Sequence, residues 1–164
     1  MHRRTAFAAG LGLGMFVALA VPSFADEDDD VAVVRDYLAA WNAHDAARAA
    51  AFMDEHVTYL DVTVGEPQRG RDAARDNIIQ VFMTAAPDLV WTMKNEPVAD
   101  DDTVAFEWTF KGTNTGAWGP ETPATGKPFS FDGVTLIRLD EDKIVYQGDY
   151  YDALGLQKQL GWLP

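Results

Sequence analysis

The 164-residue chain has no cysteine, only three histidines, and 13 basic residues against 26 acidic ones. The lack of cysteine excludes disulfide bonds and thiol catalysis, so the domain must depend on its hydrophobic core. His44 and His56, the two histidines beyond the N-terminal segment, are too far apart to form the ligand pair of a helical zinc site, and we expect no metal. Because the net charge is −13 and no basic patch is visible, nucleic acid and anionic membrane surfaces are poor partners.

Residues 1–25 have the composition of a secretory signal peptide. Arg3 and Arg4 precede an apolar run at 6–21, and residues 23–25 offer small side chains at the cleavage positions. We therefore expect a mature domain of residues 26–164 in the periplasm or outside the cell, free of the membrane after cleavage. A membrane anchor is the less favoured alternative, since the run is short, contains glycines and is followed at once by acidic residues. The arginine pair leaves the general secretory and twin-arginine routes both open.

The apolar spacing predicts three helices before residue 90. The acidic residues 26–30 should form a solvated tail that leads into a first helix ending near residues 42–44. Asp45 should cap a second, alanine-rich helix that extends to about Met53. A third helix should begin at Arg71 and end before Pro87.

Alternation of apolar and polar residues predicts five strands, at 57–64, 89–98, 103–111, 129–139 and 143–151. Residues 114–127 are rich in glycine and proline and should form a long loop that could overhang a pocket. A short helix at about 153–160 ends the chain. This order predicts an α+β fold in which a curved antiparallel sheet wraps around the N-terminal helices and leaves a cone-shaped hollow. Ligand sites favour such concavities.

The last predicted strand carries an unusual acid. Asp149 lies between Gln147 and Tyr151 on one face of a strand rich in Ile, Val and Tyr, although Asp is disfavoured in strands and costly to bury alone. In an apolar cone the pKa of its carboxyl group would rise, so that it could exchange a proton with a carbon next to a carbonyl near neutral pH. The alternative is a structural Asp that pairs with a tyrosine at the open end of the sheet.

Other candidates also have two interpretations. Tyr59 and Asp61 share a face of the strand at 57–64. Asp61 is either a second acid in the cavity or a solvated residue. Tyr59 either donates a hydrogen bond to the substrate or has a structural role. Aromatic residues at core spacing, such as Trp41 and Trp108, either line an apolar pocket or fill the core.

The position of Asp132 depends on the turn at residues 140–142. A two-residue turn pairs Asp140 with Lys143 and places Asp132 on the same face as Asp149, where two acids would shift each other's pKa. A three-residue turn exchanges the faces and turns Asp132 away. The sequence leaves both possibilities open.

Four segments and the order of elements carry a family resemblance. The segments are residues 37–45 (YLAAWNAHD), Gly70-Arg71, residues 149–152 (DYYD) and residues 156–161 (LQKQLG). Over residues 30–161 the chain resembles the SnoaL-like polyketide cyclase family. This family belongs to the nuclear transport factor two-like superfamily, which includes ketosteroid isomerase and uses one cone-shaped fold for several functions.

The resemblance implies a reaction without cofactor. In the characterised cyclases an Asp on the last long strand is the general acid/base of an intramolecular aldol closure, and Asp149 occupies the matching position. Comparison with ketosteroid isomerase places Asp61 at the proton-abstracting Asp and Tyr37 at the oxyanion-hole Tyr. The acidic oxyanion donor of that enzyme falls near Thr135, which implies that this chain lacks that donor.

We therefore expect an exported acid/base enzyme of the isomerase, aldol cyclase or lyase type that acts on a small apolar carbonyl compound. Asp149 and Asp61 are the candidate catalytic residues. The alternative is a non-catalytic exported protein that holds a small hydrophobic ligand in the same cone. A homodimer is a further hypothesis. The candidate substrate-binding residues are Tyr37, Trp41, Tyr59, Trp108, Gln147 and Tyr151.

Overall fold

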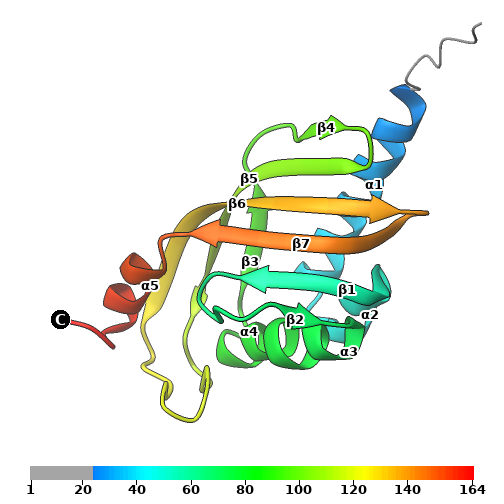
Figure 1. The fold of residues 1–164 in the computed structure, drawn as a ribbon. Helices are drawn as coiled ribbons and strands as arrows, with labels where there is room; N and C mark the ends of the chain where they lie inside the picture. Colours follow the sequence, from blue (N-terminus) through cyan, green and yellow to red (C-terminus); the bar gives the residue numbers. More distant parts are fainter. Residues whose placement is uncertain (1–23) are drawn as a thin grey trace, which may run out of the picture.

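The computed structural model describes residues 24–164, in which one curved sheet wraps around helices (Figure 1). The strand order is β2-β1-β7-β6-β5-β3, and the short β4 pairs with β5 beside β3. This arrangement confirms the predicted α+β fold. The signal peptide predicted for residues 1–25 lies outside the described residues, except that Phe24 and Ala25 begin the first helix. Between residues 24 and 164, no helix has both the length and the apolar character needed to cross a membrane.

The helices largely follow the predicted pattern. The first one starts at Phe24, so the prediction of a solvated tail at residues 26–30 is wrong. Negative side chains interact favourably with the dipole at a helix N-terminus, which explains why the acidic run is helical. Asp45 caps the second helix as predicted, because its carboxylate accepts a hydrogen bond from the backbone N–H of Arg48 at 2.9 Å. The helices are α1 (Phe24–Asn42), α2 (Ala46–Ala51), α3 (Arg71–Ala74), the π-helix η1 (Arg75–Ile79), α4 (Gln80–Ala85) and α5 (Ala153–Leu160).

The third predicted helix is not uniform, because the π-helical turn η1 separates α3 from α4. A π-helical turn contains more residues than an α-helical one and therefore rotates the side chains that follow it. As a result Ile78 and Ile79 are both buried, whereas Val81, which lies three residues after Ile78 and would share its face in a regular α-helix, is partly exposed. Phe82, four residues after Ile78, is 5% exposed, as α-helical spacing predicts.

The strands differ from the prediction in three respects. The first one begins and ends earlier than the predicted segment 57–64, and the predicted strand at 89–98 is two separate strands. The first and last strands run parallel to each other, so the sheet is not wholly antiparallel. The strands are β1 (Met53–Asp61), β2 (Gln68–Arg69), β3 (Val90–Met93), β4 (Val98–Asp100), β5 (Thr103–Thr113), β6 (Pro128–Asp140) and β7 (Lys143–Tyr151).

The hairpin between β6 and β7 has a two-residue turn. Asp140 pairs with Lys143, and the two residues between them, Glu141 and Asp142, have φ angles of 45° and 62°. Positive φ at both central residues is typical of the type I′ turn, whose twist matches that of the flanking strands. The shorter of the two turns considered from the sequence is therefore the observed one.

A β-bulge after this turn reverses its expected effect on Asp132. The register shifts by one residue beyond Leu139, and this shift exchanges the faces of the paired strands. Consequently Thr135 pairs with Asp149, and Asp132 is exposed on the outer face, where it accepts hydrogen bonds from Lys94 and Thr109. The prediction that a two-residue turn would place Asp132 beside Asp149 is wrong.

Aromatic side chains fill the inner side of the curved sheet. Trp91 on β3, Trp108 and Phe110 on β5, and Phe131 on β6 are each less than 9% exposed. Trp41 of α1 packs edge-on against Trp91, with 5.3 Å between the ring centroids. This cluster forms an apolar cup against the helices, into which the inward-facing residues of β1 and β7 project.

Candidate active site

Asp149 lies inside the aromatic cup, held by residues of three adjacent strands. Parallel pairing of β1 with β7 places Asp61 opposite Asp149, and β6 places Thr135 on the other side. Asp149 is 5% exposed. Its carboxyl group accepts hydrogen bonds from the Tyr59 hydroxyl at 2.7 Å, from the Thr135 hydroxyl at 2.6 Å, and from Gln147 Nε2 at 3.1 and 3.2 Å.

Burial raises the pKa of Asp149 to about 7, and the negative charge of Asp61 acts in the same direction. The hydrogen bonds from Thr135, Tyr59 and Gln147 stabilise the carboxylate and oppose this rise. Burial dominates, so both protonation states of Asp149 are populated near neutral pH. A group with such a pKa is suited to accepting and returning a proton.

Asp61, the second acid, is 2% exposed and lines the same cavity. Its Oδ1 atom accepts hydrogen bonds from the backbone N–H and hydroxyl of Thr63 and from the Tyr151 hydroxyl at 3.0 Å. Among the described residues its Oδ2 atom accepts one hydrogen bond, at 3.1 Å from the same Tyr151 hydroxyl. Oδ2 therefore retains capacity to accept a further hydrogen bond.

Tyr37 and Gln147 reach Asp149 through a hydrogen-bonded chain. The Tyr37 hydroxyl donates to Gln147 Oε1 at 2.8 Å, and Gln147 donates to the carboxyl group of Asp149. Both residues are fully buried and lie outside the set that lines the cavity. Trp108 acts similarly from the other side, because its indole N–H donates to the Thr135 hydroxyl at 2.7 Å.

The cavity next to Asp149 has a free volume of only about 20 Å³. A space of this size holds about one water-sized group, so a larger molecule can enter only if side chains move. The structure brings four of the predicted substrate-binding residues and both acids to its wall. The lining residues are Trp41, Tyr59, Asp61, Phe82, Trp91, Trp108, Phe110, Phe131, Asp149 and Tyr151.

A second, outer pocket of about 430 Å³ lies beyond Phe82, whose side chain lines both spaces. Trp118, from the predicted loop at 114–127, packs on Phe82 with 4.9 Å between ring centroids and also contacts Trp162. The loop therefore overhangs a pocket as predicted. The outer pocket is lined by Thr63, Val64, Asn77, Val81, Phe82, Trp118, Thr122, Leu156, Gln157, Trp162 and Leu163.

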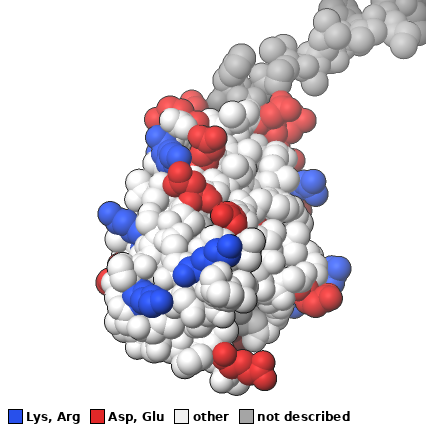
Figure 2. Space-filling model, turned by 90° about the vertical axis from the view of Figure 1, so that its left-hand side faces the viewer, with Lys and Arg blue, Asp and Glu red and all other residues white. Residues whose placement is uncertain are grey.

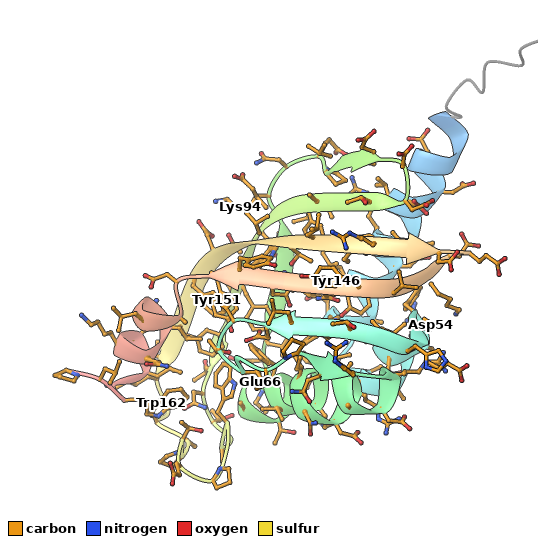
Figure 3. The ribbon with its side chains drawn as sticks, in the orientation of Figure 1. Asp54, Glu66, Lys94, Tyr146, Tyr151 and Trp162 are labelled. Atoms are coloured by element: carbon orange, nitrogen blue, oxygen red, sulfur yellow. The ribbon has the colours of Figure 1, made fainter. Side chains whose placement is uncertain are left out.

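The outer pocket opens at the end of the molecule that carries α5 and the loop. Tyr151 at the end of β7 and Trp162 after α5 both lie at this end (Figure 3). Figure 2 faces the same end, and most of the surface there carries neither acidic nor basic side chains. A largely apolar molecule would therefore meet little charge on its way in. No group of three or more His, Cys, Asp or Glu side chains within residues 24–164 could hold a metal ion.

Among the residues at the site, Thr135, Thr63 and Phe82 were not proposed as site residues from the sequence. Thr135 appeared only as the counterpart of a missing donor, and its contact with Asp149 depends on the β-bulge in the hairpin. Thr63 lies just past β1 and orients Asp61. Phe82 has the same apolar spacing as any core residue of its helix, so no pattern identifies it as the residue between two pockets.

The curved sheet, the helices that close it and the buried acids in its hollow define a cone-fold protein of the nuclear transport factor two-like superfamily. A family model described as SnoaL-like polyketide cyclase matches residues 31–160. The chain belongs to this family. Membership supports a small-molecule cyclase or isomerase type of function, with small organic substrates. A search of curated proteins found no match.

Solved structures show the same fold at low sequence identity. AclR from Streptomyces galilaeus, described as a proposed hydroxylase, is 23% identical with a TM-score of 0.71, covering 84% of this chain and 99% of that one. A proposed SnoaL-like polyketide cyclase from Jannaschia sp. CCS1 is 16% identical with a TM-score of 0.72, covering 84% and 95%. IdmH from Streptomyces antibioticus, a proposed polyketide cyclase, is 22% identical with a TM-score of 0.67, covering 80% and 98%. Their descriptions name different reactions, so these structures support the fold. The type of reaction must be inferred from the residues of the site.

Proposed function

We propose that the protein is an acid/base enzyme of the isomerase, aldol cyclase or lyase type that acts on a small, largely apolar carbonyl compound without a cofactor. The observation that carries this proposal is the position of Asp149, which is buried in an aromatic cup, lines its cavity, and has a pKa of about 7. In its charged form Asp149 removes a proton from the carbon next to the carbonyl group. It then returns the proton to another atom of the same molecule, so no proton is gained or lost overall.

Asp61 has two effects in this scheme. Its charge helps to raise the pKa of Asp149, and its Oδ2 atom is the less occupied carboxylate oxygen of the pair. Tyr59 and Tyr151 are predicted substrate-binding residues, but their hydroxyl groups donate to Asp149 and Asp61. Burial and the nearby acids raise the pKa of both tyrosines, so they remain protonated donors.

The small cavity limits how the substrate can bind. It accommodates one oxygen-sized group, whereas the outer pocket is large enough for one or two rings. The reacting end of the substrate would therefore occupy the inner cavity while its apolar body occupies the outer pocket. Phe82 lies at the junction, and its side chain must turn aside for the two parts to be bound together.

The proposal is tested by proton exchange at carbon, which does not require the natural substrate. In deuterated buffer at neutral pH, the protein should accelerate exchange of the α-protons of 1-indanone, a bicyclic ketone, as measured by NMR. Asp149→Asn should lower this acceleration by about 100-fold or more, because an amide cannot accept the proton. Asp132→Asn on the outer face of β6 is the matched control and should retain the rate. Equal rates for Asp149→Asn and the unmodified protein, or no acceleration by the unmodified protein, would contradict the proposal.

One observation favours the non-catalytic alternative. Three donors occupy the carboxyl group of Asp149, and the cavity beside it is nearly filled. A protein that only binds a hydrophobic ligand would bind 1-indanone without exchanging its protons. Asp149→Asn would then leave the affinity unchanged.

We also propose that residues 1–25 direct export and that the mature protein is periplasmic or secreted, on the strength of their composition. A homodimer remains a hypothesis. Val98, Val134 and Tyr150 are exposed large hydrophobic residues, on or beside the outer face of the sheet, and could contribute to such an interface. Light scattering of the purified protein would decide between monomer and dimer.

A further inference from the structure

A buried hydrogen-bonded chain links α1 to the carboxyl group of Asp149. The Tyr37 hydroxyl donates to Gln147 Oε1 at 2.8 Å, and Gln147 Nε2 donates to both carboxyl oxygens of Asp149, at 3.2 and 3.1 Å. Tyr37 and Gln147 are 0% exposed, and neither lines the inner cavity. Comparison with ketosteroid isomerase placed Tyr37 at the oxyanion-hole Tyr, but here its hydroxyl is placed to act on Gln147 and not on a ligand.

The direction of the hydrogen bonds in this chain is set at the Tyr37 end. Burial and the charge of Asp149 raise the pKa of the Tyr37 phenol, so the hydroxyl keeps its proton. Because an amide oxygen can only accept, this proton favours the orientation in which Gln147 turns Oε1 toward α1 and its two N–H groups toward Asp149. The opposite orientation would place an amide oxygen against a carboxylate and take this acceptor away from Tyr37.

The carboxyl group of Asp149 is surrounded by donors. Tyr59 donates to Oδ2 at 2.7 Å, and Thr135 donates to Oδ1 at 2.6 Å. A charged carboxylate accepts these bonds and those from Gln147, whereas a protonated carboxyl group must also place its own proton on an acceptor. In the observed orientation the amide of Gln147 offers it none. The orientation of this amide therefore favours the charged form, which is the form that removes a proton.

We propose that Tyr37 is a positioning residue, whose hydroxyl holds the Gln147 amide in the orientation that stabilises the charged, proton-accepting form of Asp149. Without the hydroxyl, Gln147 is free to turn Oε1 toward a protonated Asp149, which stabilises the uncharged form. The hydroxyl also polarises the amide and so strengthens its N–H groups as donors. This inference deepens the proposed function and rests on it for the catalytic consequence, but the effect on the protonation of Asp149 does not depend on catalysis.

Other titratable groups also face Asp149. The charge of Asp61 on β1 adds to the effect of burial in raising the pKa of Asp149. The pKa values of Tyr59 on β1 and of Tyr146 and Tyr151 on β7 are raised, chiefly by burial for Tyr59 and Tyr151 and by the hydrogen bond to its neighbour on the outer face for Tyr146. These tyrosines therefore stay uncharged between about pH 5 and about pH 9, and Asp61 is common to every protein compared below.

The test follows the titration of Asp149 by NMR of the full-length protein, labelled with carbon-13 at the side-chain carboxyl groups of aspartate. Asp149→Asn assigns the signal by its loss. In Tyr37→Phe we expect the midpoint of the titration to lie at higher pH than in the unmodified protein, because the charged form loses support. Tyr150→Phe removes a hydroxyl from the outer face of the same strand and is the matched control, which should leave the midpoint in place.

A double-substitution cycle shows whether Tyr37 acts through Gln147. Gln147→Met keeps a side chain of similar size and removes the amide, so it should also move the midpoint to higher pH. If the amide carries the effect, adding Tyr37→Phe to Gln147→Met should move the midpoint little further. Additive shifts, or an unchanged midpoint in Tyr37→Phe, would overturn the inference.

The rate of proton exchange in 1-indanone gives a second readout. At about pH 6, Tyr37→Phe should lower the rate by about 3- to 10-fold, because a larger share of Asp149 is protonated and cannot accept a proton. At about pH 9 Asp149 is charged in both proteins, and the two rates should converge. A merely structural role for Tyr37 would lower the rate by the same factor at every pH, which would also overturn the inference.

A further measurement needs no substitution of Tyr37. In the unmodified protein labelled with nitrogen-15 in its glutamine side chains, the Nε2 protons of Gln147 should shift with the same midpoint as the carboxyl carbon of Asp149. A shared midpoint supports the inference, and signals that do not respond overturn it, even if Tyr37→Phe fails to fold.

The outcomes separate this inference from the proposed function. If the midpoint of Asp149 depends on Tyr37 but the unmodified protein does not exchange the protons of 1-indanone, the positioning role stands and the enzymatic proposal is wrong. If exchange depends on Asp149 but the midpoint does not depend on Tyr37, the enzymatic proposal stands and the positioning role is wrong.

Discussion

The side chain of Asp149 is buried, and the pKa of its carboxyl group nevertheless lies close to neutral pH. Its burial would by itself keep the carboxyl group protonated, whereas hydrogen bonds from Thr135, Tyr59 and Gln147 favour the charged form. Burial outweighs the hydrogen bonds and brings the pKa to about 7, so the charged and uncharged forms of Asp149 are close in free energy at neutral pH. The same balance makes the stability of the fold depend on pH, because the unfolded chain has no such environment.

We expect the free energy of unfolding to fall between about pH 4 and pH 7 through this group. Over that range the unfolded chain has lost the proton of Asp149, whereas the folded protein keeps it until the pKa of about 7. The native state thus binds more protons, and stability decreases as pH rises, by at most roughly 4 kcal/mol. Asp149→Asn removes the contribution of this group to the pH dependence. Urea unfolding at pH 4.5 and pH 8 measures the effect, and parallel pH profiles for the two proteins would contradict it.

The sequence was most informative for residues that violate a local rule. Asp149 was identified because a carboxylate is unusual in the middle of a strand, and Tyr59 with Asp61 because they share a face. Thr135 could not be paired with Asp149 in advance, since their contact depends on a one-residue shift of register.

At the scale of elements, the periodicity of apolar residues predicted the existence and type of most helices and strands. It did not predict which side a residue faces where one extra residue is inserted into an element. The π-helical turn η1 and the β-bulge in β7 each change the side on which the following residues lie. The second insertion helps to build the site, because it brings Thr135 to Asp149. Parallel pairing of β1 and β7 is a long-range contact that local periodicity does not encode.

The position of Phe82 predicts a role in ligand access. Phe82→Leu should widen the junction between the pockets and increase the association rate of 1-indanone several-fold, because less side chain must turn aside. Loss of aromatic packing against Trp118 and Phe110 should lower the free energy of unfolding by about 1 to 3 kcal/mol. Stopped-flow tryptophan fluorescence measures the rate.

The neighbouring buried residue, Met83, lines neither pocket and provides the control. Met83→Leu conserves volume and should leave the association rate unchanged. If Phe82→Leu and Met83→Leu give the same rate as the unmodified protein, access to the inner cavity does not pass Phe82.

At the scale of the whole molecule, few of the charged surface side chains lie at the end that carries the outer pocket (Figure 2). The chain has a net charge of −13, yet the end that carries the outer pocket shows a mostly uncharged surface (Figure 2). The acids of the site are buried beneath aromatic rings and do not contribute to that surface. The overall charge therefore favours solubility, while the local surface favours an apolar ligand.

The N-terminal segment leads to a prediction about the mature protein. Cleavage after Ala25 would remove only the first two residues of α1 and leave Asp26 at its new start, so the acidic residues would still favour the helix dipole. Removing residues 1–25, which contain Arg3 and Arg4 but no acid, would also bring the net charge to about −15. We expect mass spectrometry of protein recovered from the periplasm or the medium to find an N-terminus near Asp26. Replacing both arginines with glutamine should leave the uncleaved chain inside the cell, because the positive end of a signal peptide is needed for export. Intact Met1 on exported protein would contradict cleavage.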